Sequence, residues 1–262
     1  MQRWIRVRFG CLLLAICAGG SAFAQDSFSA WDVQFLYGAT YREPDIRSNI
    51  PKALITFENT AGWSWGSNYF FVDCLRSFSE ADSNATEVYA EWYPSISLRH
   101  LAGRNPGSGL IRDISLTPAI NAGVRSTGPQ AFVLLPGITI DLTVPHFKYL
   151  SIQALAYIDR SNFNGEDFGV HATSFQFTPN WSVPFHIGDA QLSFDGFFDY
   201  IGKHGIADHQ FLAQPQLKLD LSSFWNRPGK VLAGVEWQVW RNKYGVPGLN
   251  ENVVQALVLW NL

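Results

Sequence analysis

The sequence has few charged residues and no long apolar run. Asp, Glu, Lys and Arg make up 16% of its 262 residues, whereas soluble globular chains have about 25%. No apolar stretch reaches about 18 residues, which excludes a helical membrane protein. The 47% apolar content excludes intrinsic disorder. The net charge is 19 − 22 = −3, so nucleic acid is not an expected partner.

Aromatic residues, in contrast, are abundant. They make up 15% of the chain and include ten Trp. Low charge with many aromatic side chains is unusual in a soluble protein and ordinary in one whose outer surface contacts lipid. The composition therefore points to a membrane protein that does not cross the bilayer with helices.

The first 24 residues have the pattern of a secretory signal peptide. A basic start is followed by the short apolar segment Cys11–Ala18 and by an A-x-A site at Ala22–Ala24. We predict cleavage before Gln25, a barrel domain over residues 25–262, and export to the bacterial outer membrane. A lipoprotein anchored at Cys17 is the less favoured alternative, because the bulky Ile16 precedes it. Cleavage leaves Cys74 as the one cysteine of the mature chain, which excludes an intramolecular disulfide.

After residue 25 the sequence alternates apolar and polar residues in segments of about ten, as barrel hairpins do. Val88, Ala90 and Trp92, for example, alternate with Glu87, Tyr89 and Glu91. About twelve strands are predicted, near residues 30–41, 52–59, 67–76, 85–97, 110–122, 131–143, 149–159, 170–180, 189–200, 210–221, 230–242 and 252–262. An even number of strands predicts the fold class: all-β, a closed transmembrane antiparallel β-barrel.

Some features interrupt or orient these strands. Proline lacks an N–H, so four prolines are expected at bulges or strand ends: Pro94, Pro118, Pro136 and Pro215. Residues 123–130 break the alternation. The apolar positions are expected to face lipid, among them Val235, Trp237, Val258 and Trp260.

A soluble β-sandwich would also alternate, but other features favour the membrane. The polar faces combine acids with Tyr or Gln, and the apolar faces end in Trp or Tyr, as interfacial girdles do. The last strand runs to the final residue, with Trp260 two positions before Leu262, which resembles the assembly signal of outer-membrane proteins.

Several stretches in order along the chain resemble one channel family. They are Glu87–Ser97, Phe132–Leu142, Phe177–Phe185, Phe194–Asp199, Pro215–Leu221 and Trp240–Gly245. The chain resembles the nucleoside-specific channel-forming Tsx family, including its vibrio branch known as a phage receptor. The resemblance implies a twelve-stranded barrel, here expected as a monomer, with a narrow pore that admits nucleosides. It also implies phage tail proteins as partners, in addition to the lipid of the outer membrane.

If the polar faces point inward, acids and aromatic rings line the lumen while few bases, such as Lys218, do so. The predicted pore-lining residues are Glu58, Asp73, Glu87, Tyr89, Glu91, Tyr69, Phe71, Asp141, Asp195 and Glu236. Nucleobases stack on aromatic rings, ribose hydroxyls suit carboxylate acceptors, and an acidic lumen repels phosphate. The alternative is that these polar residues merely fill the barrel.

The densest group is Glu87, Tyr89 and Glu91 on one face of one strand. We expect this strand to line the constriction, with Tyr89 stacking on the base and the carboxylates accepting ribose hydroxyls. The competing interpretation is that bases from neighbouring strands hold both acids.

Catalysis is not expected. His171 and Ser174 are three residues apart and so fall on opposite faces of a strand, where neither activates the other. The loop residues His204, Asp208 and His209 could ligate a metal, but such residues are usually solvated. The sequence predicts a passive channel without a cofactor. The alternatives are a non-transporting structural or phage-receptor barrel and, less favoured, a lipid-modifying barrel enzyme.

Overall fold

A computed structural model describes residues 27–262 apart from residues 45, 129, 164–165 and 168–171. The predicted signal peptide, residues 1–24, and its cleavage site lie outside the described residues. Among the described helices none is long and apolar enough to cross a membrane.

Nearly all regular structure is β-strand, and the helices are short. The strands of the large sheet are β1 (Phe28–Tyr41), β2 (Ile50–Trp63), β3 (Gly66–Ser77), β4 (Thr86–Ser97), β5 (Ile111–Arg125), β6 (Ala131–Leu142), β7 (Tyr149–Asp159), β10 (Thr173–Ile187), β11 (Ala190–Ile201), β12 (Gln210–Ala213), β13 (Gln216–Asp220), β14 (Val231–Arg241) and β15 (Glu251–Asn261). The remaining elements are the small hairpin β8 (Asn162–Phe163) and β9 (Glu166–Asp167), and the helices α1 (Leu98–Leu101), η1 (Leu221–Trp225) and η2 (Lys243–Gly245).

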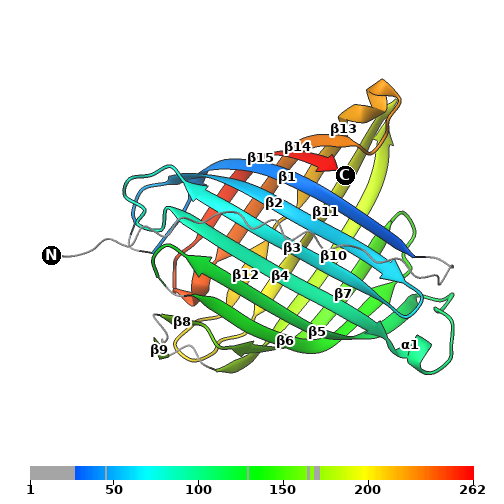
Figure 1. Ribbon diagram of the computed structural model, residues 1–262, viewed down its shortest axis with the longest axis horizontal. Helices are drawn as coiled ribbons and strands as arrows, with labels where there is room; N and C mark the ends of the chain where they lie inside the picture. The colour runs from blue at the N-terminus through cyan, green and yellow to red at the C-terminus, as the bar shows by residue number, and fades with distance from the viewer. Residues whose placement is uncertain (1–26, 45, 129, 164–165, 168–171) are drawn as a thin grey trace.

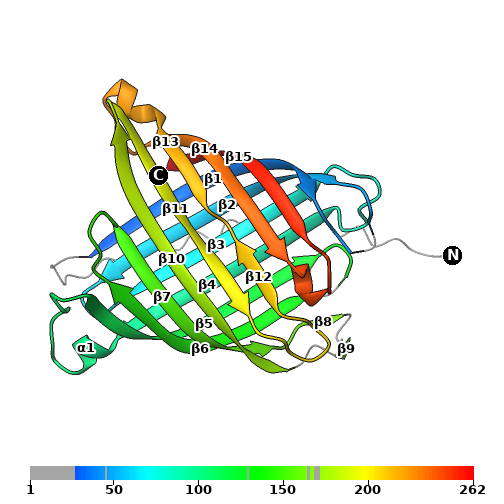
Figure 2. The same ribbon diagram turned by 180° about the vertical axis from the view of Figure 1, so that it is seen from behind.

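The long strands close into a barrel. Consecutive strands pair antiparallel, and β1 pairs with β15, where Phe35 lies opposite Val258. Figures 1 and 2 show the strands running obliquely around this single barrel, from opposite sides. Closure is required in lipid, because an open edge would leave backbone N–H and C=O groups without partners.

β12 and β13 are two halves of one strand. Both pair with β11 and with β14, and the register runs unbroken from Phe198↔Ala213 to Asp195↔Gln216. Pro215, which has no N–H to donate, lies in the gap. The sheet has thirteen strands in the described chain, and counting β12 and β13 as one gives 13 − 1 = 12 barrel strands. The predicted all-β, twelve-stranded antiparallel barrel is confirmed.

The predicted strands appear with shifted ends. The strand expected at residues 170–180 instead spans Thr173–Ile187, and β5 runs to Arg125, into the stretch expected to be irregular. Pro94, Pro118 and Pro136 lie inside β4, β5 and β6, so the expectation of strand ends is wrong for them. Pro118 lies opposite Pro136, and the regular β4–β5 pairing skips the residues around Pro94 and Pro118. The missing proline N–H groups account for this interruption.

The outer face is apolar and the inner face is mostly polar. Val235 and Trp237 are 44% and 49% exposed, whereas Glu236 between them is 6% exposed. Val258 and Trp260 on the next strand are exposed as well. Exposed apolar side chains that alternate with buried polar ones reverse the order found in soluble proteins. The predicted lipid-facing residues are therefore on the outside, and the protein is an outer-membrane barrel.

The two ends of the barrel differ. β1 begins and β15 ends at one end, where the turns at residues 64–65 and 188–189 are tight and the segments 98–110 and 221–230 are longer. The opposite end, here called the outer mouth, carries segments 42–49, 78–85, 202–209 and 242–250. Two-residue turns are typical of the periplasmic side, and on this ground we infer that the outer mouth faces the cell exterior.

Candidate functional site

All ten predicted pore-lining residues lie on inward faces, but they do not form one site. Seven of them belong to the adjacent strands β2, β3 and β4, and the other three, Asp141, Asp195 and Glu236, are on β6, β11 and β14. The strand register aligns Glu58 with Phe71, and Phe71 with Glu91. β2–β4 therefore present a continuous patch of acids and rings to the lumen.

Rings and carboxylates in this patch contact one another. The ring centroids of Tyr69 and Phe71 are 6.0 Å apart, and those of Phe71 and Tyr89 are 6.2 Å apart. The Tyr69 hydroxyl donates to Glu58 at 2.9 Å, and the Tyr89 hydroxyl donates to Glu91 at 2.7 Å. These residues, Glu58, Tyr69, Phe71, Tyr89 and Glu91, are called the aromatic wall below.

The acids of the aromatic wall have neutral partners. Asn121 on β5 donates through Nδ2 to Glu91 at 2.9 Å. Among the described residues, no Lys, Arg or His lies within ion-pair distance of Glu58 or Glu91. The buried Oδ1 of Asn121 has no hydrogen-bond partner in the described structure. Glu91 and Asn121 thus offer acceptor atoms to a solute that carries N–H or O–H groups.

A second group of inward residues is built around amides, which sequence reasoning did not single out. Glu236 accepts hydrogen bonds from Gln216 at 2.8 Å, Gln255 at 2.6 Å and Gln214 at 3.3 Å. Each glutamine occupies a polar position of an alternating strand, so the signal was present in the sequence. The amides satisfy the buried carboxylate without a cation.

Apolar side chains also occupy part of the interior. One buried cluster lies on β1, β2 and β15 and includes Leu36, Leu54 and Leu257. Another lies on β4–β7 and includes Leu135 and Leu155, and Tyr69 of the aromatic wall packs against this cluster. The lumen is therefore bounded by apolar as well as polar surface.

Besides Glu87, which pairs with Arg125 at 3.2 Å, two further predicted pore-lining acids are held by bases. Asp195 lies 3.0 Å from Nζ of Lys218 and accepts from the Ser193 hydroxyl at 2.6 Å. Asp141 lies 3.7 Å from Arg112 and accepts from the Ser151 hydroxyl. Asp141 and Asp195 therefore have the partners expected if inward polar residues merely fill the barrel.

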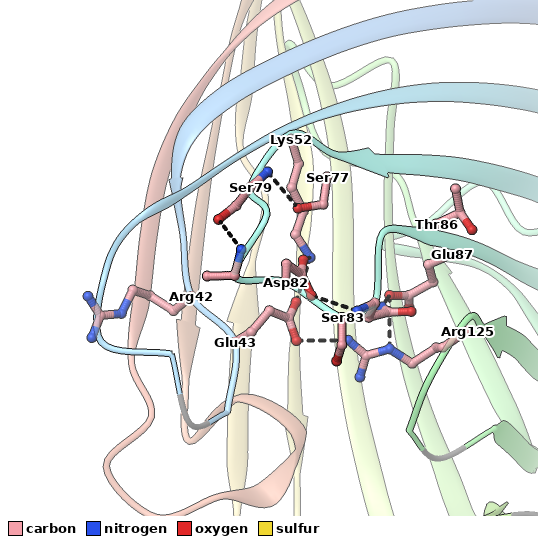
Figure 3. Close-up of polar contacts among 12 residues, drawn as sticks. Arg42, Glu43, Lys52, Ser77, Ser79, Asp82, Ser83, Thr86, Glu87 and Arg125 are labelled. Atoms are coloured by element: carbon pink, nitrogen blue, oxygen red, sulfur yellow. Dashed lines mark hydrogen bonds and ion pairs between the residues drawn. The ribbon is translucent and has the colours of Figure 1, made fainter.

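The outer mouth contains a buried ionic network (Figure 3). Glu43 in segment 42–49 is its common anion: Oε1 lies 2.6 Å from Nζ of Lys52, and Oε2 lies 2.7 Å from Nη2 of Arg125. Lys243 of η2 contacts Glu43 at 3.5 Å and Glu251 at 2.7 Å. The sequence predicted that few basic residues point into the barrel, and this prediction is wrong at the outer mouth. Lys52 and Arg125 are near strand ends and Lys243 is in a loop, where alternation carries little information.

Burial and charge act on Glu43 in opposite directions. Burial alone would raise the pKa of its carboxyl, but Lys243, Lys52 and Arg125 outweigh this effect and hold the pKa at about 2. Glu43 is therefore ionised at physiological pH.

The three loop residues considered as metal ligands do not form one cluster. His204 is buried, with Nε2 3.2 Å from Asp159 and its ring 4.9 Å from that of Tyr157. Asp208 and His209 contact each other at the surface. The described residues contain no group of three or more His, Cys, Asp or Glu that could hold a metal ion. His171 lies outside the described residues, so its relation to Ser174 stays a prediction.

Comparisons with solved structures found similar chains. The NanC porin structure matches 89% of this chain and 100% of its own, with a TM-score of 0.51 and 13% identity. The fold is that of an outer-membrane porin. The KdgM porin in complex with disordered oligogalacturonate has a TM-score of 0.44 and 8% identity, and covers 89% of this chain and 98% of its own. The NalP translocator domain from Neisseria meningitidis has a TM-score of 0.43 and 12% identity, with 88% of each chain covered.

No known family profile matches the sequence, and no curated protein matches it significantly. At 13% identity the likeness to the NanC porin is one of fold. The resemblance to the Tsx family therefore stays a prediction.

Proposed function

We propose that the protein is an outer-membrane channel for the passive diffusion of nucleosides or similar small solutes. The observation that supports this most directly is the aromatic wall. Its rings lie beside carboxylates that have no cationic partner among the described residues, and beside the unpartnered Oδ1 of Asn121.

This arrangement suits a nucleoside. A nucleobase stacks on an aromatic ring, and each contact contributes about 1–3 kcal/mol. Ribose hydroxyls and exocyclic amino groups donate hydrogen bonds, which Glu91 and Asn121 accept. A phosphate group would meet the unpaired acids Glu58 and Glu91 and be repelled. No bond is made or broken in this process, so the proposal involves neither an enzyme nor a cofactor.

The resemblance of several stretches to the Tsx family supports the same substrate class. It covers Glu87–Ser97, the strand that carries Tyr89 and Glu91. The contacts within the aromatic wall come from the structure, and the resemblance comes from the sequence of the same strand.

Flux into liposomes tests the proposal. Purified protein in vesicles should admit uridine faster than uridine monophosphate, and faster than glucose, which has no aromatic ring. Empty vesicles and vesicles with a Tyr89→Ala barrel are the controls. Equal entry of uridine and glucose would refute nucleoside specificity while leaving a general channel.

A second candidate is a non-transporting barrel whose outer loops bind a partner such as a phage tail protein. The buried ionic network at the outer mouth favours it, because Glu43 and Lys243 fill space that a solute would need. This candidate predicts no flux of any small solute, even from variants in which that network is broken.

A further inference from the structure

We propose that residues 242–245 form a strap that closes the outer mouth, and that Glu43 is the latch that holds it. The inference concerns access to the lumen and goes beyond the proposed choice of solute. It rests on three features: contacts across the lumen, burial, and backbone strain.

The latch joins parts of the wall that are not neighbours. Lys52 is on β2, Arg125 is on β5, and Lys243 follows β14. β3 and β4 separate β2 from β5, and β15 and β1 separate β14 from β2. A single carboxylate that contacts all three cations therefore has to lie inside the barrel, between strands that are not adjacent. Figure 3 shows Glu43 extending from its loop toward the guanidinium of Arg125.

The strap reaches the far wall. The ring of Tyr244 stacks with Arg125, whose Cζ lies 4.8 Å from the ring centroid. Lys243 donates through Nζ to the backbone carbonyl of Arg42 at 2.8 Å, and Asp208 N donates to Gly245 O at 2.8 Å. The strap thus ties segments 42–49 and 202–209 together over the lumen.

The network leaves little room for water. The side chains of Glu43, Lys52 and Lys243 are 4%, 4% and 3% exposed. Buried ion pairs cost desolvation that their mutual attraction only partly repays, so such a network is weak evidence of a purely stabilising role.

The backbone of the strap is strained. Asn242 has φ 47° and Tyr244 has φ 60°, in the left-handed region, which asparagine tolerates but a bulky residue such as tyrosine rarely adopts. A bulky residue stays in such a conformation only when its surroundings impose it. When the contacts of Glu43 and Tyr244 are lost, the strap therefore relaxes away from the lumen. A segment that merely filled the barrel would not need this strain.

Planar-bilayer recordings in simple salt test the latch without reference to nucleosides. Glu43→Gln removes the common counter-ion of three cations, while Lys52 keeps Asp82, Arg125 keeps Glu87 and Lys243 keeps Glu251. Lys243→Met removes the ion pairs of the strap with both Glu43 and Glu251. Each change should raise the time-averaged conductance about tenfold, because it removes ion pairs that favour the closed state of a two-state equilibrium. Glu80→Gln, at an exposed position in the adjacent segment 78–85, is the matched control and should behave as the wild type.

The double variant Glu43→Gln/Lys243→Met separates a latch from general destabilisation. Because both residues act in one contact, the double variant should conduct no more than the more conductive single variant. Folding of each variant is checked by its heat-modifiable mobility in gel electrophoresis. Folded Glu43→Gln and Lys243→Met barrels with wild-type conductance would overturn the latch, as would a lumen that stays non-conducting in every folded variant. Opened variants that pass salt but do not prefer nucleosides would support the latch and refute the proposed function.

Discussion

Glu87 forms an ion pair with Arg125, with 3.2 Å between Oε2 and Nε. Glu91, on the same face of β4, instead accepts hydrogen bonds from the neutral Tyr89 hydroxyl and Asn121 amide. Two acids that look equivalent in the sequence therefore have different environments. Glu87 belongs to the ionic network of the outer mouth, and Glu91 belongs to the aromatic wall.

This difference predicts opposite results from two similar substitutions. Glu91→Gln should lower the preference of the pore for cations and relax the exclusion of phosphorylated solutes, because it removes an unpaired charge from the lumen. Glu87→Gln should leave selectivity nearly unchanged and weaken the outer mouth, because its charge is already offset by Arg125. The reversal potential across a salt gradient measures both effects. An anion-selective or unselective wild-type pore would contradict the prediction.

Tyr89→Ala should weaken the block of conductance by added nucleoside about tenfold, since one lost stacking contact is worth about 1–3 kcal/mol. Tyr200→Ala makes the same chemical change on the lipid face, where Tyr200 is exposed, and should leave the block intact. Dose–response curves for uridine on single channels give the comparison. Equal loss in the two variants would mean that the aromatic wall does not bind the base.

Val235→Arg should destabilise the barrel by about 2–4 kcal/mol if Val235 lies near the bilayer midplane, because it puts a charge in lipid. Glu236→Gln should cost much less, because its partners Gln214, Gln216 and Gln255 are amides that can also pair with a glutamine side chain. Denaturant titration of refolding into vesicles measures both. Similar costs for the two changes would contradict the assignment of the faces.

The latch should resist acid. Burial would raise the pKa of Glu43, but Lys243, Lys52 and Arg125 lower it from 4.5 to about 2. A carboxyl whose pKa is depressed on folding contributes stability above its unfolded pKa, and the contribution is lost as pH falls toward the folded value. The stability difference between wild type and Glu43→Gln should therefore be constant above pH 4.5 and shrink between pH 4.5 and about 2. A difference that already declines between neutral pH and pH 5 would refute this assignment.

Segment 202–209 should loosen as pH rises. Burial would lower the pKa of His204, but its hydrogen bonds with Asp159 and the Gly202 carbonyl raise it above 6.5. A group whose pKa is raised on folding contributes stability below its unfolded pKa, and the contribution is lost as pH rises through the folded value. Hydrogen exchange corrected for its intrinsic pH dependence should show less protection of this segment above pH 6.5, and His204→Gln should remove the dependence. Protection that increases over the same range would contradict the prediction.

The strands and their faces could be predicted from the sequence. Alternation at period two is a local property, so Val235 and Glu236 can be assigned to lipid and lumen without knowledge of their neighbours. The same reasoning placed Tyr89 and Glu91 on one inward face. The expectation that Pro94, Pro118 and Pro136 lie at strand ends was wrong. The three prolines lie opposite one another on adjacent strands and interrupt the backbone hydrogen bonds at one place, which the sequence of a single strand does not show.

The partners of the inward acids were decided by the tertiary structure. Glu43 and Arg125 are 82 positions apart, and Lys243 meets the backbone of Arg42 across 201 positions. Such contacts depend on how the barrel closes and on how loops without periodicity fold into it. The sequence by itself determined a barrel with an apolar exterior and an acidic, aromatic interior. Only the closed structure decided that Glu87 pairs with a cation, that Glu91 has none within the described part of the chain, and that Glu43 lies across the outer mouth, because charge pairing depends on distance through space.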